Sequence, residues 1–231
     1  PLLRALYPRA YVDVNREPYE LDPDMFEHPL PPYVNTTSAR VAAGLGTIAR
    51  IVGNRREIYR AKLSFAEAER RIAGVHKPYH QALRAMVARA RQQFGFCILL
   101  DCHSMPSSGL PMDPEGDGRA VDIVIGDRNR TSCYSALPDM VHHRLTVAGY
   151  HVIRNNPYAG GYTTQHYGNP ADGIHTLQIE VNRALYMDET TLQRRSGFAK
   201  VQADLTGLIR HIIGFGAECA SEFQYQRLSA E

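Results

Sequence analysis

The chain has 231 residues, which is enough for one sizeable α/β domain, and no shift in composition asks for two. Its 26 lysines and arginines nearly balance its 24 aspartates and glutamates, so a formal net charge of +2 gives no electrostatic argument for a nucleic-acid or membrane partner. We therefore expect a single domain, residues 1–231, that acts on a small molecule. The oligomeric state stays open.

The four cysteines, at positions 97, 102, 133 and 219, form no CxxC pair and no zinc-ribbon spacing. We expect reduced, buried thiols and a cytoplasmic protein. No stretch has the length of a membrane span, and no basic-then-apolar leader is present. The chain enters strand-like sequence directly at Pro1, so we expect a further segment before it.

In the first third of the chain, residues 10–15 (AYVDVN) predict a strand, and the proline-rich and acidic residues 17–38 predict a long surface excursion. The S-x-x-E pattern of Ser64 and Glu67 predicts a helix start. Pro78 should end or kink that helix and begin a second one, which Gly95 closes.

The remaining elements alternate in type. Residues 97–103 (CILLDCH) predict a central strand, and 121–127, 151–156 and 175–181 predict three more. Helices are expected over 135–148, ending at Gly149, and over about 188–214. The last of these should have Ile209 and Ile213 on its core face. Residues 105–120 and 156–175 are rich in turn residues and predict loops that serve the site. The order predicts an α/β fold with helices on both faces of a mixed, mostly parallel sheet.

Two of the predicted strands carry a reactive residue near their carboxyl ends, His103 in CILLDCHSMP and Glu180 in HTLQIEVNR. Active sites of α/β folds lie at this end of the strands. Imidazole is the commonest side-chain metal ligand, and a carboxylate beside a metal-bound water is the usual general base in hydrolysis. The pair therefore suggests metal-assisted hydrolysis.

Each candidate also has a structural alternative. Asp101 lies two residues before His103 and points to the same side, so it can orient a metal ligand or simply satisfy a buried histidine. Glu180 lies on an apolar strand, and the alternation along that strand places Gln178 on the same face. The carboxylate of Glu180 needs a cation, a metal or a proton, but an ion pair with Arg183 would also serve. Both alternatives stay open at this point.

Asn15 ends the first predicted strand and Arg16 follows it, where a guanidinium can bind a carboxylate with two hydrogen bonds. Structural pairing of Arg16 with Glu17 or Asp13 is the alternative, and it is favoured when the pair is considered alone.

Other sequence motifs lack the neighbouring residues that would confirm a functional site. His76 and His80 have the spacing of a helical zinc pair, but Pro78 lies between them and the glutamate of HExxH is absent. No G-x-S-x-G elbow exists, and Cys102 should point away from His103 in a strand.

Four segments in order, VDVNREPYELDPDMF, DCHSMPS, VDIVIGDRNRTSC and NPYAGGYTTQHYGNPADGIHTLQIEVNRALYMDE, resemble the N-formylglutamate amidohydrolase family, also called N-formylglutamate deformylase. The resemblance runs from end to end of the chain. It implies a three-layer α/β/α sandwich of the zinc-carboxypeptidase-like (phosphorylase/hydrolase-like) type and a Zn²⁺, or another divalent metal, that activates water. It also implies further metal ligands on a histidine-bearing strand before Pro1, where this sequence offers none.

By that resemblance His103 is a metal ligand and Glu180 the catalytic glutamate, while Asn15 and Arg16 hold a substrate carboxylate. His166 matches the substrate-facing wall. A second carboxylate on the substrate calls for another cation, and the candidates are Arg128, Arg154 and Arg183.

The implied reaction is metal-dependent hydrolysis of N-formyl-L-glutamate to formate and L-glutamate, at the end of histidine degradation. Two alternatives are a deacylase of another N-acyl amino acid and a non-catalytic homologue that binds amino-acid derivatives.

Overall fold

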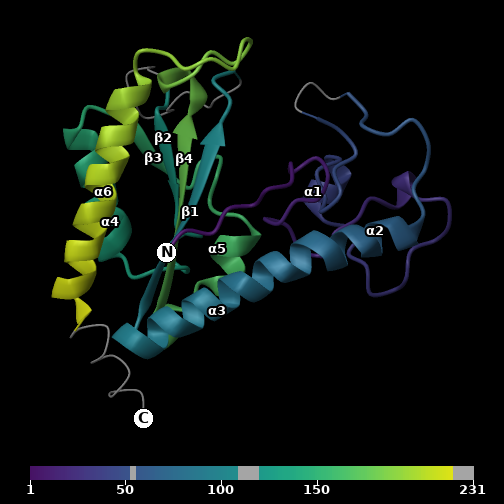
Figure 1. Cartoon of the computed structure of the whole chain (residues 1–231), viewed down its shortest axis with the longest axis horizontal. Helices are drawn as coiled ribbons and strands as arrows, with labels where there is room; N and C mark the ends of the chain where they lie inside the picture. Colours follow the sequence, from purple (N-terminus) through teal and green to yellow (C-terminus); the bar gives the residue numbers. More distant parts are fainter. Residues whose placement is uncertain (53–55, 109–119, 221–231) are drawn as a thin grey trace. The chain divides into compact units, whose positions relative to one another are not determined.

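The computed structural model describes residues 1–52, 56–108 and 120–220, and the chain divides into two compact units, residues 1–88 and 89–231 (Figure 1). Each unit is described by itself, and the expected single domain stays a prediction. No helix in the described ranges is long and apolar enough to cross a membrane.

The first unit is built mainly from irregular chain around a small apolar core. Its helical elements are η1 (Pro23–Met25), α1 (Ala39–Ala42), α2 (Phe65–Arg71), η2 (Ile72–His76) and the start of α3 (Lys77–Phe94). The core consists of buried apolar side chains from the loops, η1 and α2, namely Leu21, Met25, Phe26, Val34, Ile48 and Ala68.

The strand predicted over residues 10–15 was wrong. Val12 and Val14 are buried as a strand pattern predicts, but the segment forms turns and irregular chain. A side chain explains the difference: the carboxylate of Asp13 accepts a hydrogen bond from the backbone N–H of Asn15 at 2.9 Å, which bends the chain.

The predicted start and interruption of the helical segment are confirmed. The Ser64 hydroxyl accepts a hydrogen bond from the Glu67 N–H at 3.2 Å and caps α2. The Glu67 carboxylate does not complete a capping box, because it pairs with Arg70 and Arg71. The π-helical turn η2 ends at His76, two residues before Pro78, which has no backbone N–H to donate. α3 ends at Phe94.

The second unit contains a four-stranded sheet in the order β1-β4-β2-β3 (Figure 1). The strands are β1 (Cys97–Met105), β2 (Ile123–Gly126), β3 (Val152–Arg154) and β4 (Ile174–Asn182). β1 pairs with β4 and β2 with β3 in parallel, whereas β2 and β4 are antiparallel. The mixed, mostly parallel sheet is therefore confirmed. β1 pairs with β4 alone and therefore lies at the edge of the described sheet. The prediction that it is a central strand was wrong for this sheet.

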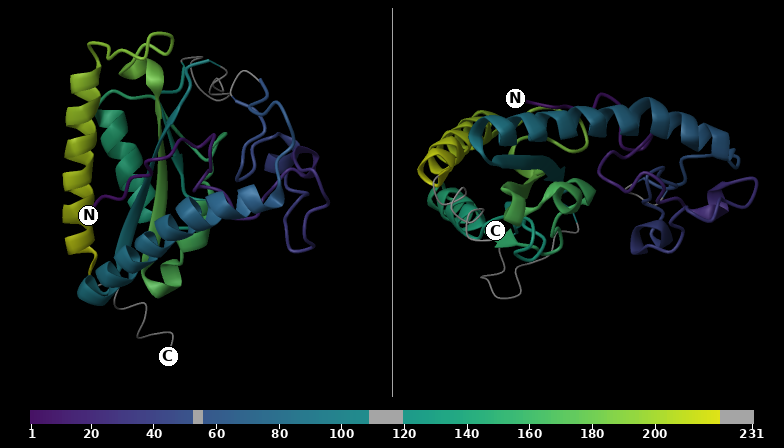
Figure 2. Two further views of the ribbon diagram at one scale, coloured as in Figure 1. Left: turned by 45° about the vertical axis from the view of Figure 1, so that its right-hand side comes forward. Right: turned by 90° about the horizontal axis from the view of Figure 1, so that it is seen from below.

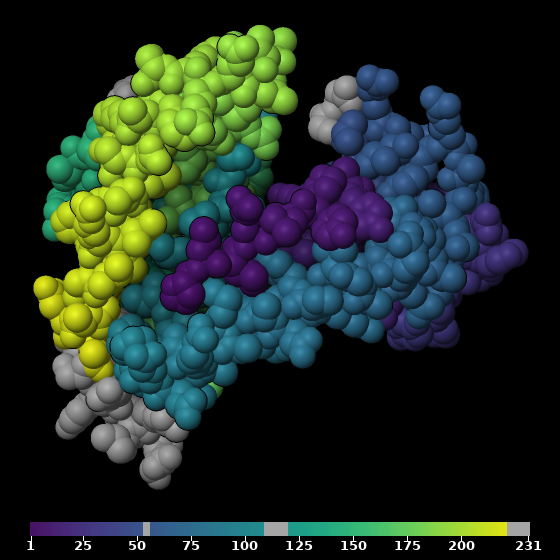
Figure 3. Space-filling model, in the orientation of Figure 1, coloured from purple at the N-terminus to yellow at the C-terminus, as the bar shows by residue number. Residues whose placement is uncertain are grey.

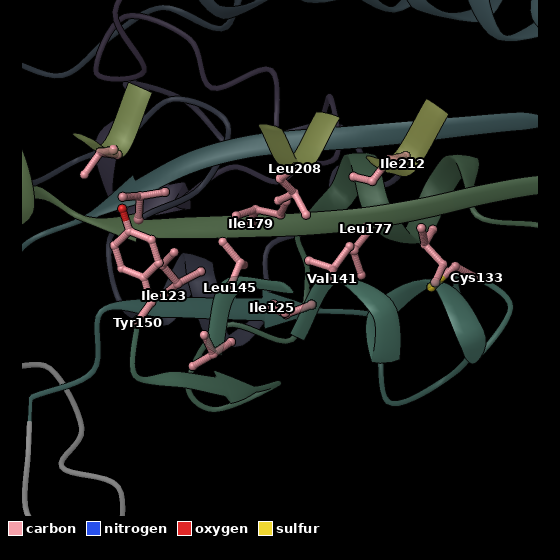
Figure 4. Close-up of a cluster of buried hydrophobic side chains, with 14 residues drawn as sticks. Ile123, Ile125, Cys133, Val141, Leu145, Tyr150, Leu177, Ile179, Leu208 and Ile212 are labelled. Atoms are coloured by element: carbon pink, nitrogen blue, oxygen red, sulfur yellow. The ribbon is translucent and has the colours of Figure 1, made fainter. Parts of the chain in front are cut away.

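Helices cover both faces of this sheet (Figure 2). α4 (Ala136–Val147) and α6 (Phe198–Glu218) pack on one face through a core that includes side chains from β2, β3 and β4 (Figure 4). α5 (Tyr162–Tyr167) lies on the other face, where the Thr164 carbonyl accepts a hydrogen bond from the Thr176 hydroxyl at 2.7 Å. The α/β fold with helices around the sheet is confirmed, whereas the likeness to zinc carboxypeptidases stays a prediction.

The last helix begins ten residues later than predicted, at Phe198 instead of Asp188. The Asp188 carboxylate accepts hydrogen bonds from the N–H groups of Thr190 and Thr191, which stabilises a turn instead. Ile209 and Ile213 were expected in the core but are 47% and 67% exposed on α6. Figure 3 shows α6 (yellow) on the surface of the molecule.

The two predicted loops have different outcomes. Residues 156–175 are not structureless, because they contain α5 and the short helix η3 (Pro170–Asp172). Of residues 105–120, positions 109–119 lie outside the described residues.

All four cysteines are free thiols. Cys97 and Cys133 are buried as expected, and burial raises the pKa of Cys133 to about 12. Cys219 is half-buried and Cys102 is exposed, so the prediction of burial was wrong for Cys102. Cys133, with so high a pKa, stays a thiol and is a poor nucleophile near neutral pH.

Candidate active site at the carboxyl ends of β1 and β4

His103 and Glu180 are direct partners across the parallel pair of β1 and β4. Each stands two residues before the end of its strand, so both lie at the same edge of the sheet. Paired residues on neighbouring parallel strands share a face and have backbones about 4.8 Å apart. The structure therefore brings together the two reactive residues that the sequence predicted.

Asp101 holds the ring of His103. Its Oδ1 lies 2.8 Å from Nε2 of the imidazole, and the two side chains are 12% and 15% exposed. A carboxylate oxygen can only accept, so Nε2 carries the proton. A neutral His103 then presents Nδ1 as its acceptor nitrogen, which is the form that binds a metal or accepts a proton.

Glu180 is 7% exposed and lies between a polar and an apolar neighbour. His103 is its partner on β1, and Val124 is its partner on β2. The side chain of Gln178, two residues earlier on the same face, donates from Nε2 to Oε1 of Glu180 at 2.9 Å. This hydrogen bond stabilises a carboxylate that would be costly to bury alone.

Arg183 joins the ends of the two strands. Its Nε donates to the Ser104 hydroxyl at 3.1 Å, and its Nη2 lies 3.4 Å from the Ser104 carbonyl. Arg183 is thus at the edge that carries His103 and Glu180. The Glu180 carboxylate, three residues before Arg183 in the sequence, accepts a hydrogen bond from Gln178.

The first turn of α5 lies over the sheet beside Gln178. The Gly161 N–H donates to Oε1 of Gln178 at 2.7 Å. Arg128 holds the same segment, because its backbone N–H donates to Ala159 O at 2.7 Å and its Nη1 donates to Gly160 O at 3.2 Å. Arg128 therefore shapes the approach to α5 by contacts within the chain.

His166 is on the exposed side of α5. Its ring stacks on Tyr162 with centroids 4.8 Å apart and an interplanar angle of 17°. It also meets the ring of Tyr167 edge to face, with centroids 4.9 Å apart. The three rings give α5 an aromatic surface that is open to solvent at His166.

Arg154 lies on the other face of the sheet. It is the register partner of Ile125, which belongs to the core under α4 and α6. Its guanidinium donates to Asp139 Oδ1 at 2.7 Å and to the Pro138 carbonyl at 2.9 Å, both in α4. As a candidate anchor for the substrate Arg154 is therefore wrong, because it faces away from Glu180.

The described residues do not form a complete metal site. Residues 1–52, 56–108 and 120–220 contain no group of three or more histidine, cysteine, aspartate or glutamate side chains arranged to hold a metal ion. A catalytic zinc needs three protein ligands, and this edge of the sheet offers His103 with Glu180 and Asp101 beside it. The metal and the ligand role of His103 stay predictions.

In the first unit, Asn15 and Arg16 stand on a tight turn. Arg16 donates from Nε to the Leu45 carbonyl at 3.0 Å and from Nη1 to the Asn15 carbonyl at 2.9 Å. Its Nε lies 3.8 Å from Asp13 Oδ2. Burial lowers the pKa of Arg16, and the charge of Asp13 opposes this effect. Asp13 thus serves as the structural partner that the sequence offered as an alternative.

His76 and His80 support this turn. Nε2 of His76 lies 2.9 Å from the Arg16 carbonyl, and Nε2 of His80 lies 2.8 Å from the Val14 carbonyl. Both rings are 3% exposed, and a carbonyl can only accept, so each Nε2 carries a proton. The two histidines were not predicted to be a zinc pair, and their hydrogen bonds give them a structural role.

Replacing His80 with Phe should lower the thermal stability of the protein. An aromatic ring is kept, but the buried Val14 carbonyl loses its donor, which costs about 1–3 kcal/mol. Thermal unfolding should show a lower Tm for His80→Phe than for His143→Phe, which changes an exposed histidine. An equal Tm for both variants would mean that the Val14 carbonyl finds another donor.

Two residues of the site had no role predicted from the sequence. Gln178 was placed on the face of Glu180 but received no role, and the alternation along the strand was the available signal. Gly126 is the register partner of Gln178 on β2, and a Cβ there would meet the backbone of residues 158–160 at 2.7 Å. Only the tertiary structure shows that close approach.

Comparison with known proteins gives a consistent result. Residues 1–187 match the N-formylglutamate amidohydrolase family. The chain is 34% identical over 164 residues to an N-formylglutamate deformylase of Pseudomonas putida, covering 70% of this chain and 58% of that protein. It is 32% identical over 168 residues to one of Pseudomonas aeruginosa, covering 71% and 62%. The chain thus spans about three fifths of the length of these relatives.

Solved structures agree in fold. A crystal structure of N-formylglutamate amidohydrolase from Ralstonia eutropha JMP134 superposes with a TM-score of 0.82 at 39% identity, covering 90% of this chain and 74% of that one. A gene product from Agrobacterium tumefaciens has a TM-score of 0.58 at 19% identity, covering 89% and 68%, and shares the fold. Together with the match over residues 1–187, these likenesses show that the chain belongs to the N-formylglutamate amidohydrolase family.

Proposed function

We propose that the protein hydrolyses the formyl amide of N-formyl-L-glutamate to formate and L-glutamate. The observation that carries the proposal is the buried Glu180 beside His103 at the carboxyl edge of the sheet, in a chain of this family. A buried carboxylate next to a held imidazole supplies the proton transfers that amide hydrolysis requires.

Glu180 acts as the general base and then as the general acid. It takes a proton from the attacking water as the water oxygen bonds to the formyl carbon. It then gives that proton to the glutamate nitrogen as the C–N bond breaks. The hydrogen bond from Gln178 holds the carboxylate in place for both transfers.

His103, held by Asp101, is proposed as one ligand of a divalent metal, with zinc as the first candidate. Such a metal polarises a carbonyl and lowers the pKa of bound water toward neutrality. The described residues contain no group of three or more histidine, cysteine, aspartate or glutamate side chains arranged to hold a metal, and the further ligands are proposed to lie outside the described ranges. Metal dependence is part of the proposal and is tested separately below.

Substrate contacts are proposed for the basic residues that the family resemblance indicated. Arg16, with Asn15, is proposed to bind a substrate carboxylate. Arg183 is proposed for the second carboxylate, supported by its place at the edge with Glu180. His166 and Arg128 are proposed to act through α5, His166 by its exposed ring and Arg128 by holding residues 159 and 160.

A role at the end of histidine degradation and a place in the cytoplasm complete the proposal. The reaction releases glutamate, which suits a terminal catabolic step. Four free thiols suit a reducing compartment.

The proposal is tested by assaying the protein with N-formyl-L-glutamate and a panel of N-acetyl and N-formyl amino acids, with added zinc. We expect formate release to be fastest from N-formyl-L-glutamate. Removing metal with a chelator should lower the rate, and added zinc should restore it, while metal analysis follows the bound ion. Activity confined to a non-formyl substrate would indicate a different deacylase, and a metal-free protein that binds glutamate derivatives without turnover would indicate a non-catalytic homologue.

A further inference from the structure

We propose that Gln178 is a positioning residue that fixes the Glu180 carboxylate and ties it to the first turn of α5. This inference rests on the proposed function, because it assigns Gln178 a role in the proton transfers of Glu180. It predicts that the conformation of the α5 segment and the position of the Glu180 carboxylate both depend on the Gln178 side chain.

Two hydrogen bonds through one amide carry the inference. The Gly161 N–H donates to Oε1 of Gln178 at 2.7 Å, and Nε2 of Gln178 donates to Oε1 of Glu180 at 2.9 Å. Gln178 is 4% exposed and Glu180 is 7% exposed, so water competes little with either bond. The result is a short relay from the α5 backbone to the carboxylate.

The chemistry of the two ends fixes the direction of the relay. A backbone N–H can only donate, so it selects the carbonyl oxygen of the Gln178 amide. The amino group must then point at Glu180, where it meets a group that accepts. An uncharged amide accepts through its oxygen and donates through its nitrogen, so the Gln178 side chain matches both partners.

The backbone of β2 makes room for this arrangement. Gly126 pairs with Gln178, and a Cβ at Gly126 would lie 2.7 Å from atoms of Tyr158, Ala159 and Gly160. The absence of a side chain lets residues 158–160 pass directly over the sheet next to Gln178. The Gly161 N–H can reach the amide because the segment lies so close.

A second contact between β4 and α5 provides a matched control. Thr176 lies two residues before Gln178 on the same face, is fully buried, and donates from its hydroxyl to the Thr164 carbonyl at 2.7 Å. Thr176→Val therefore removes a buried hydrogen bond between the same two elements without removing one from Glu180.

The test compares Gln178→Met, Gln178→Asn and Thr176→Val with the wild type. Met keeps the length and shape of the side chain without its hydrogen bonds, and Asn keeps the amide on a shorter stem. We expect Gln178→Met to lower kcat about 10- to 100-fold with KM changed less than about 3-fold, the loss expected for a hydrogen bond to a charged group. Gln178→Asn should lose nearly as much, because it cannot span both partners. Thr176→Val should keep kcat.

Hydrogen exchange at the Gly161 amide gives a readout that does not need activity. Exchange should be faster in Gln178→Met than in the wild type and in Thr176→Val. A kcat of Gln178→Met within about 2-fold of wild type, or an equal loss in Thr176→Val, would overturn the positioning role. If the wild type hydrolyses no N-acyl amino acid, the proposed function fails, and unchanged exchange at Gly161 would then overturn the relay as well.

Discussion

Glu180→Gln should lower kcat for N-formyl-L-glutamate by about 10²- to 10⁴-fold, the usual contribution of a general base. The amide has nearly the size of the carboxylate but cannot take a proton from water. Glu180 is 7% exposed beside His103, so bulk water does not easily replace it as a base. The measurement is the initial rate of formate release at saturating substrate.

The fold and the metal content should survive this change. Circular dichroism, thermal unfolding and metal analysis of Glu180→Gln should match the wild type to within the variation seen for Glu69→Gln, which changes an exposed glutamate on α2. Near-normal turnover by a folded Glu180→Gln protein would mean that another group accepts the proton.

His103→Ala should lower turnover by at least about 10²-fold and lower the amount of metal bound per chain, because one imidazole ligand is lost. The Asp101–His103 contact of 2.8 Å has a further consequence. Asp101→Asn keeps the shape but removes the charge behind the ring, and partners of this kind are worth about 10- to 100-fold in metal affinity or activity. Metal analysis after dialysis and steady-state kinetics check both variants.

The same experiment decides between the two interpretations of His103. His143→Ala, on the exposed side of α4, serves as the control and should retain metal and activity. A His103→Ala protein that keeps its metal and its turnover but melts at a lower temperature would mean that His103 is a buried structural histidine satisfied by Asp101.

Patterns in the local sequence predicted the directions of side chains correctly where the chain forms a regular strand. The alternation along β4 correctly put Gln178 and Glu180 on one face, and the spacing of Asp101 and His103 correctly put both on one side of β1. A strand has a fixed period of two, so such assignments need no knowledge of neighbours.

Local patterns failed where side chains compete with the regular backbone. The apolar residues of 10–15 resembled a strand, but the Asp13 carboxylate captures the Asn15 N–H. The predicted helix start at Asp188 became a turn for the same reason, with Thr190 and Thr191 as donors. Aspartate can stabilise either a helix start or a turn, and the sequence pattern alone does not choose between them.

The sequence by itself determined the α/β class, the candidate residues for the chemistry and the family resemblance. Only the tertiary structure decided that His103 and Glu180 are neighbours, because residues 77 positions apart meet only through the register of β1 and β4. It also decided that Arg154 faces α4 and that Gln178 links Glu180 to Gly161. Strand order and close backbone approach depend on contacts between distant segments, and no local pattern encodes them.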